Sequence, residues 1–102
     1  ILESVGYEVD LAIDGRAALE KLKQKKFNLV ITDITMPNMN GFELTSCIKN
    51  DDKYKDIPVI MVTAEEKEDD KKRGVEVGAE AYILKSAFDQ KGLLDIIERL
   101  IR

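Results

Sequence analysis

Apolar and polar positions fall into blocks along this chain, and the blocks differ in their period. Residues 29–31 and 59–62 are continuous apolar runs of the kind that form strands buried on both faces of a sheet. Residues 81–84 make a third short apolar run, whereas residues 7–13 alternate, which is typical of a half-exposed strand. The pattern therefore predicts four strands.

Between these strands, apolar residues recur at helical spacing. The segments expected to be helical are residues 16–26, 42–49, 65–77 and 93–101. Asp14 is the predicted N-cap of the first helix, and Gly78 is expected to end the densely charged third helix, which should be short and exposed. The apolar face of the second helix is predicted to consist of Leu44, Cys47 and Ile48.

Strand and helix alternate throughout with short connections. This order favours an α/β fold with one parallel sheet and helices on both faces. A length of 102 residues is enough for a single domain with one core, so residues 1–102 are read as one domain. Residues 1–5 have the spacing of a last helical turn, with Gly6 as its cap, and we therefore expect native sequence upstream of Ile1.

Composition and charge narrow the function. The net charge is −4, from 16 basic and 20 acidic residues, and no basic block is present, so direct nucleic-acid binding is not expected. The absence of histidine excludes histidine-based zinc sites and histidine general bases. One cysteine cannot form an internal disulfide, which favours a cytoplasmic protein, and no apolar run is long enough to predict a membrane span.

Three polar residues follow three of the predicted strands. Asp33, Thr63 and Lys85 each end a buried strand, and parallel strands bring such residues to one edge of the sheet. A carboxylate can attack phosphorus, and a cation and a hydroxyl can bind the phosphoryl oxygens. Each residue alone has a simpler interpretation, as a turn-former, a β-branched strand residue or a solvated lysine. Their coincidence at successive strand ends favours phosphoryl chemistry.

Several segments then resemble one family in order along the chain. The segment ITDITMPNMNG at residues 31–41 is similar to the phosphoacceptor segment of response-regulator receiver domains, the phosphoacceptor modules of bacterial two-component signalling. VTA at residues 62–64 resembles their switch-threonine segment, and AYILK at residues 81–85 resembles the approach to their lysine. GYEV at residues 6–9 and AIDG at residues 12–15 resemble the stretch before their second helix.

The resemblance implies a flavodoxin-like, doubly wound parallel sheet and a role for each matching residue. Asp33 would accept a phosphoryl group from the phosphohistidine of a histidine kinase or phosphotransfer domain, and Thr63 and Lys85 would bind that group. Thr63 and Tyr82 would act as the switch, with Tyr82 turning inward on activation to alter contacts with an output domain or protein. Mg²⁺ would be bound by Asp33 and the backbone carbonyl of Thr35. The domain would be a regulatory phosphoacceptor and not an enzyme in its own right.

Two departures from the family pattern lead to further expectations. The family's acidic pair, which helps to bind Mg²⁺, and its N-terminal central strand would precede Ile1, so residues 1–102 should form an incomplete receiver. Such a fragment is expected to fold poorly or to complete its sheet by strand exchange or homodimerisation, because unpaired strand edges are costly. Ser86 stands where most members have a cis proline, and residues 85–90 are similar to receivers fused to chemotaxis-type hybrid histidine kinases.

Alternative functions remain open at this point. A receiver-like fold can bind partners without phosphorylation, and the missing acidic pair fits that description for residues 1–102 alone. An aspartate-nucleophile phosphatase would carry a second aspartate at the position of Thr35, and a cobalamin-binding relative would need a histidine ligand. The sequence therefore favours the phosphoacceptor and keeps the phosphorylation-independent interaction module as its main alternative.

Overall fold

The computed structural model describes residues 14–34, 39–64, 67–86 and 90–101, and strands and helices alternate through them. The predicted strand over residues 7–13 and the active-site loop residues 35–38 lie outside these ranges. The elements, in chain order, are α1 (Gly15–Gln24), β1 (Val30–Asp33), α2 (Gly41–Lys49), β2 (Val59–Thr63), α3 (Glu68–Glu76), β3 (Ala81–Leu84) and α4 (Gln90–Ile101).

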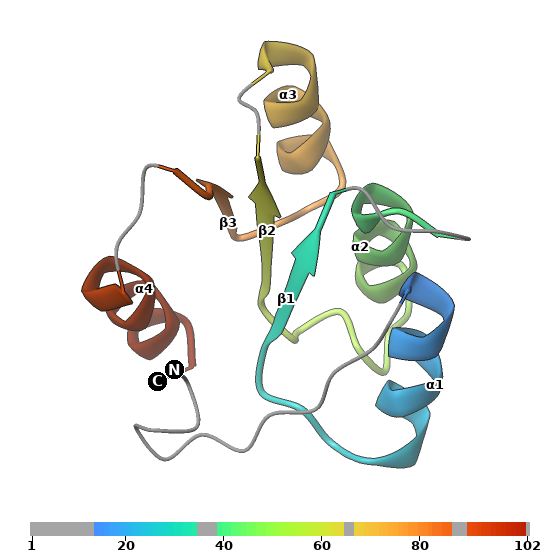
Figure 1. Ribbon diagram of the computed structural model, residues 1–102. Helices are drawn as coiled ribbons and strands as arrows, with labels where there is room; N and C mark the ends of the chain where they lie inside the picture. Colours follow the sequence, from blue (N-terminus) through green and yellow to red (C-terminus); the bar gives the residue numbers. More distant parts are fainter. Residues whose placement is uncertain (1–13, 35–38, 65–66, 87–89, 102) are drawn as a thin grey trace.

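The three described strands form one parallel sheet in the order β1-β2-β3. Asp33 pairs with Val62, and Thr63 pairs with Leu84, so the strands end nearly level with one another. Figure 1 shows α1 and α2 on one side of this sheet and α4 on the other. The predicted arrangement of a parallel sheet between helices is therefore confirmed, and the fold is flavodoxin-like.

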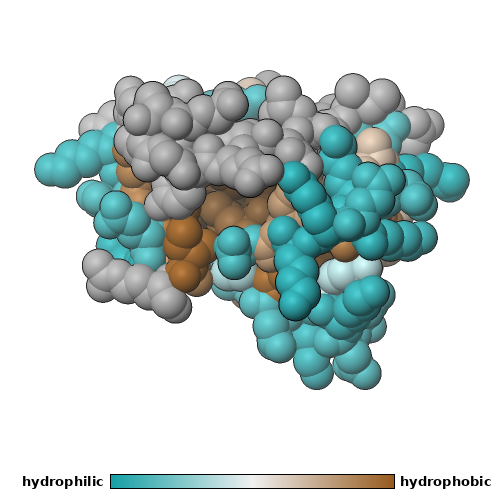
Figure 2. Space-filling model, turned by 90° about the horizontal axis from the view of Figure 1, so that it is seen from below, coloured by the Kyte–Doolittle hydropathy of each residue, from teal (hydrophilic) through white to brown (hydrophobic). Residues whose placement is uncertain are grey.

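The core consists of two clusters on opposite faces of the sheet, because successive side chains of a strand point to opposite sides. On β2, Val59 and Met61 pack with Leu22 of α1 and Leu44 of α2. On the other face of the sheet, Ile60 of β2 packs with Ile83 of β3 and Ile97 of α4. Figure 2, which views the amino ends of the strands, shows hydrophobic side chains in the middle and hydrophilic ones outside.

Strand β1 departs from the prediction that it is buried on both faces. Ile31 is 38% exposed, whereas the β2 residues Ile60 and Met61 are fully buried. On the same face, the buried Ile97 of α4 packs against Ile60 and Ile83, which belong to β2 and β3 and not to β1. A continuous apolar run shows that a strand can be buried on both faces, but whether it is buried depends on the elements that pack over it.

Helix α2 confirms two of the three residues predicted for its apolar face, Leu44 and Ile48, and corrects the third, Cys47. Cys47 is exposed, and the buried face instead includes Phe42, Leu44, Thr45 and Ile48. Thr45 lies three residues from both Phe42 and Ile48, and Leu44 lies four residues before Ile48, so these buried residues form one continuous stripe along the helix. The hydroxyl of Thr45 donates to the carbonyl of Gly41 at 2.8 Å, which satisfies that buried polar group within the helix.

The predicted N-cap of α1 and the predicted terminus of α3 are confirmed, whereas α1 ends at Gln24, two residues before its predicted end. Asp14 caps α1 by accepting a hydrogen bond from the amide of Ala17 at 2.8 Å. Gly78 follows α3 with a φ of 95°, a conformation in which a side chain would be strained. The amides of Gly78 and Ala79 donate back to the carbonyls of Val75 and Gly74, which is the hydrogen-bond pattern of a Schellman motif.

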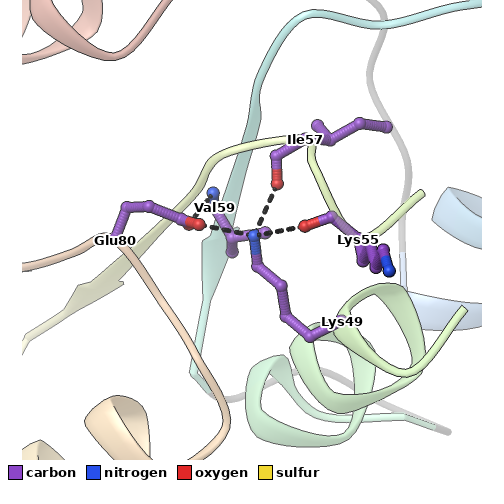
Figure 3. Close-up of polar contacts among 5 residues, drawn as sticks. All are labelled: Lys49, Lys55, Ile57, Val59 and Glu80. Carbon is purple, nitrogen blue, oxygen red and sulfur yellow. Dashed lines mark hydrogen bonds and ion pairs between the residues drawn. The ribbon is translucent and has the colours of Figure 1, made fainter. Parts of the chain in front are cut away.

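A lysine joins three segments at the amino ends of the strands. The ammonium group of Lys49, at the end of α2, donates to the carbonyls of Ile57 and Lys55 at 2.8 and 3.1 Å and pairs with Glu80 (Figure 3). The other oxygen of the Glu80 carboxylate accepts from the amide of Val59 at 2.6 Å. We call these residues the Lys49 clamp; it ties α2 to the start of β2 and to the segment before β3.

Candidate functional site

The three polar residues singled out in the sequence lie at the same edge of the sheet. Asp33 is the last residue of β1, Thr63 is the last residue of β2, and Lys85 directly follows β3. The strands are adjacent and parallel, so their carboxyl ends meet at one rim. This rim is the upper end of the sheet in Figure 1. The prediction that the three residues share one edge is confirmed.

Lys85 reaches across β2 to Asp33. Its ammonium nitrogen lies 2.7 Å from Oδ2 of Asp33, and the two side chains are 49% and 41% exposed. Val62 and Ile83, which pair in the sheet, both contribute to the core on the α4 side. Asp33 pairs with Val62, and Lys85 lies two residues beyond Ile83, so strand alternation directs both side chains toward this same side. A carboxylate and a cation therefore meet at an open, solvent-accessible position.

Thr63 is buried and lies between the other two strands. Its carbonyl accepts a hydrogen bond from the amide of Lys85 at 2.7 Å, which fixes the chain at the point where Lys85 leaves the sheet. No cis peptide bond occurs within the described residues, so the Lys85–Ser86 bond, which lies in one of these ranges, is trans. The backbone after the site thus differs from the cis-proline pattern of most receivers.

The chain after Asp33 is held close to the sheet and to α2. The amide of Ile34 donates to the carbonyl of Val62 at 3.2 Å, and the carbonyl of Ile34 accepts from the amide of Gly41 at 2.9 Å. A Cβ atom at Gly41 would lie 2.3 Å from the carbonyl oxygen of Asp33, closer than atoms can approach. Gly41 therefore lets the first turn of α2 sit directly against the backbone of Asp33.

The sequence alone does not reveal this role of Gly41, because it depends on contact with the backbone of Asp33. Asn40, which precedes it, accepts from the amide of Glu43, while Glu43 accepts from the amide of Asn40. This capping box places the start of α2 one residue after Asn40. A sequence signal for this start exists, because Asn40 is followed three residues later by Glu43, and the predicted helix start at Phe42 is one residue late.

Tyr82 lies on the face of the sheet that α1 and α2 cover. It pairs with Met61 in the sheet and packs against the cluster that contains Met61, with its hydroxyl oxygen buried. Thr63 is two residues beyond Met61, so strand alternation places Thr63 and Tyr82 on the same face of neighbouring strands. The predicted switch residues are therefore neighbours on one face, and the ring of Tyr82 is directed inward.

Mg²⁺ binding requires several oxygen ligands, and the described residues supply few of them at this rim. Asp33 is the acidic side chain there, and its carboxylate is in contact with Lys85. No group of three or more acidic, histidine or cysteine residues that could hold a metal occurs within the described ranges. Thr35, the predicted carbonyl ligand, lies outside them. The described residues alone thus do not fit a magnesium site, which needs near-octahedral coordination.

Comparison with known proteins defines the family. A model of the response regulator receiver domain matches residues 1–98, and the chain therefore belongs to the receiver domain family. Receiver domains are the regulatory modules of two-component signalling, and their function is phosphorelay signal transduction. Among the described residues, no helix has the length and apolar character needed to cross a membrane.

Curated relatives contain the domain within proteins of different length. Protein PilG of Pseudomonas aeruginosa is 37% identical over 98 residues, which cover 96% of this chain and 72% of PilG. A gliding motility regulatory protein of Myxococcus xanthus is 33% identical over 98% of this chain, but the match covers only 13% of that protein. The chain thus corresponds to one module of that larger protein.

Solved structures agree with the fold. The receiver domain of a signal transduction histidine kinase from Syntrophus aciditrophicus superimposes with a TM-score of 0.90 at 32% identity, covering 98% of this chain and 75% of that chain. Chemotaxis protein CheY4 of Vibrio cholerae gives 0.87 at 37% identity, covering 97% and 82%. A receiver domain from Pseudomonas aeruginosa, 27% identical with a TM-score of 0.87 and covering 98% and 81%, has a magnesium ion coordinated in its active-site cleft.

Proposed function

We propose that Asp33 accepts the phosphoryl group and that Lys85 and Thr63 bind it. The observation that supports this assignment most strongly is the 2.7 Å contact between the Lys85 ammonium and the Asp33 carboxylate at the exposed rim. A carboxylate that is to be phosphorylated must be open to a donor protein, and Asp33 is 41% exposed. A cation beside it is needed because the product carries more negative charge than the carboxylate.

The chemistry follows from this geometry. A carboxylate oxygen of Asp33 attacks the phosphorus of a phosphohistidine, the phosphorus–nitrogen bond breaks, and its electron pair returns to the imidazole of the donor. The product is an acyl phosphate on Asp33. Lys85, which contacts the carboxylate before transfer, then pairs with a phosphoryl oxygen, and the hydroxyl of Thr63 donates to another. The shift of Thr63 toward the phosphoryl group further favours the inward conformation of the neighbouring Tyr82, and this biases a two-state switch.

The remaining features of the proposal concern the whole protein. Mg²⁺ would be bound by Asp33 and the carbonyl of Thr35 together with carboxylates beyond those described, and it would offset charge on the transferred group. We propose a cytoplasmic, regulatory and non-enzymatic role, in which a histidine kinase or phosphotransfer domain is the donor. An output domain or protein would read the altered surface. This role is compatible both with a separate response regulator and with a receiver domain that is fused to a hybrid histidine kinase.

Phosphoryl uptake by the Asp33→Asn variant tests the assignment. The full-length protein is incubated with a radiolabelled phosphohistidine donor in magnesium buffer, and the protein-bound label is measured. We expect complete loss of label in Asp33→Asn, because an amide is a far weaker nucleophile than a carboxylate. Asp52→Asn is the matched control: this exposed carboxylate on the α2–β2 connector should remain dispensable for uptake. Unchanged labelling of Asp33→Asn would contradict the proposal.

A further inference from the structure

Helix α3 is attached to the rest of the domain in an unusual way. Its sequence, EDDKKRGVE, has no apolar stripe, and its one buried residue is Gly74. Glycine inside a helix is unfavourable by about 1 kcal/mol relative to alanine, so its presence there needs a reason. The neighbouring residue, Arg73, lies over the ring of Phe42 on α2 with its guanidinium carbon 4.5 Å from the ring centroid. Two consecutive residues thus face the domain.

The space above Gly74 is filled by the ring of Tyr82. A Cβ atom at Gly74 would lie 3.0 Å from Cδ2 and 3.4 Å from Cε2 of Tyr82, and 3.6 Å from the sulfur of Met61. The first of these distances is shorter than ordinary van der Waals contact. The ring therefore packs against the backbone of α3 at a position where any side chain would press on it.

We propose that Gly74 is the positioning residue of the switch, because it forms the slot that holds the inward conformation of Tyr82. This inference rests on the proposed function, in which the inward ring is the activated state. The slot lowers the free energy of the inward conformation before phosphorylation. Because the ring packs against the backbone of α3, a movement of the ring also moves α3. A residue with a side chain at position 74 would push the ring outward or lift α3, so position 74 sets the resting balance of the switch.

The slot can be tested through the coupling between positions 74 and 82. Gly74→Ala, Tyr82→Ala and the double variant are unfolded in urea as full chains without any phosphoryl donor. Alanine at position 74 should raise the folding equilibrium constant about fivefold in the Tyr82→Ala background, where only helix propensity changes. In the Tyr82 background, the crowding should remove that gain. An equal change in the folding equilibrium constant with Tyr82 and with Tyr82→Ala would contradict the proposed contact between positions 74 and 82.

A spectroscopic measurement separates positioning from general stability. The chain has only three tyrosines, so the ring signals of selectively labelled tyrosine can be assigned by NMR. Gly74→Ala should shift the Tyr82 ring signals and leave those of Tyr54 in place. Val75→Ala is the matched control, because it also raises helix propensity but alters a largely exposed side chain of α3. Unchanged Tyr82 signals in Gly74→Ala would likewise overturn the proposal.

The switching role is tested with beryllofluoride, which mimics a phosphoryl group, added to the full-length protein. Gly74→Ala should require several-fold more beryllofluoride than the parent for half-maximal change of the Tyr82 signals. An equal requirement in both proteins would overturn the switching role of Gly74. If the parent itself shows no response while the coupling is present, the proposed phosphoacceptor function fails and the slot stands, so the two failures can be told apart.

Discussion

Two lysine–carboxylate pairs lie at opposite ends of the same three strands, and they differ in exposure and in the number of their hydrogen-bond partners. The Lys85–Asp33 pair at the carboxyl ends is 49% and 41% exposed, and within the described residues its ammonium has one hydrogen-bond partner. The Lys49–Glu80 pair at the amino ends is 15% and 32% exposed, and further backbone hydrogen bonds surround it. The first pair is loosely held, and the second is part of a network.

The difference shows what each end of the sheet requires. An exposed ion pair contributes about 0–1 kcal/mol, so Lys85 can leave Asp33 for a phosphoryl group at little cost. A partly buried lysine whose ammonium group makes three hydrogen bonds is costly to remove, because its partners are left without a donor. The pair at the amino ends therefore stabilises the fold, whereas the pair at the carboxyl ends can exchange its contact for one with a phosphoryl group.

Removal of the Lys49 ammonium is expected to have the largest effect on stability. Lys49→Ala should lower the free energy of unfolding by about 2–4 kcal/mol, because two carbonyls and the Glu80 carboxylate lose their donor. Urea unfolding of the full chain measures this change. Lys55→Ala is the matched control: it removes an exposed lysine side chain that pairs with Asp52, while the Lys55 carbonyl that Lys49 contacts remains. An equal, small loss in both variants would show that the clamp has no special role.

A methyl group at Gly41 should have the next largest effect and should act on the site itself. Gly41→Ala places a Cβ atom against the carbonyl oxygen of Asp33, and backbone at both positions must move. We expect a loss of about 1–3 kcal/mol of stability, typical of overpacking, together with slower phosphoryl uptake. Unfolding in urea and labelling kinetics on the same samples measure both. A stabilised variant with the parental rate of uptake would contradict the close approach inferred here.

The smallest effect on stability is expected at the exposed pair. Lys85→Ala should change the free energy of unfolding by no more than about 1 kcal/mol, because solvent already screens the contact with Asp33. The same variant should lose the change in Tyr82 ring signals on addition of beryllofluoride, since the cation that pairs with the phosphoryl group is missing. A stability loss as large as that of Lys49→Ala would remove the contrast between the two ends of the sheet.

The sequence predicted those features that depend on local pattern. The alternation of strands and helices, the Asp14 cap and the Gly78 terminus each follow from residue types at fixed spacing, and the structure has them. Asp33, Thr63 and Lys85 were found because parallel strands align their ends. Such inferences need only the chain order and the direction of the strands.

Features that depend on packing between distant segments were not predictable in the same way. Exposure of Ile31 depends on how far α4 reaches over the sheet, and the slot at Gly74 depends on the ring of Tyr82. Glu80 was not singled out, because nothing local shows that its carboxylate meets Lys49 and the amide of Val59. Cys47 is exposed although cysteine is often buried, because the buried face of α2 is set by the side chains that pack against it and not by residue type alone.

Chemical trapping of the acyl phosphate shows directly whether Asp33 carries the phosphoryl group. The full-length protein is phosphorylated by its donor, treated with borohydride, which reduces an aspartyl phosphate to homoserine, and digested for mass spectrometry. We expect homoserine at position 33 in the unmutated protein. Homoserine at another aspartate, with Asp33 unmodified, would contradict this expectation.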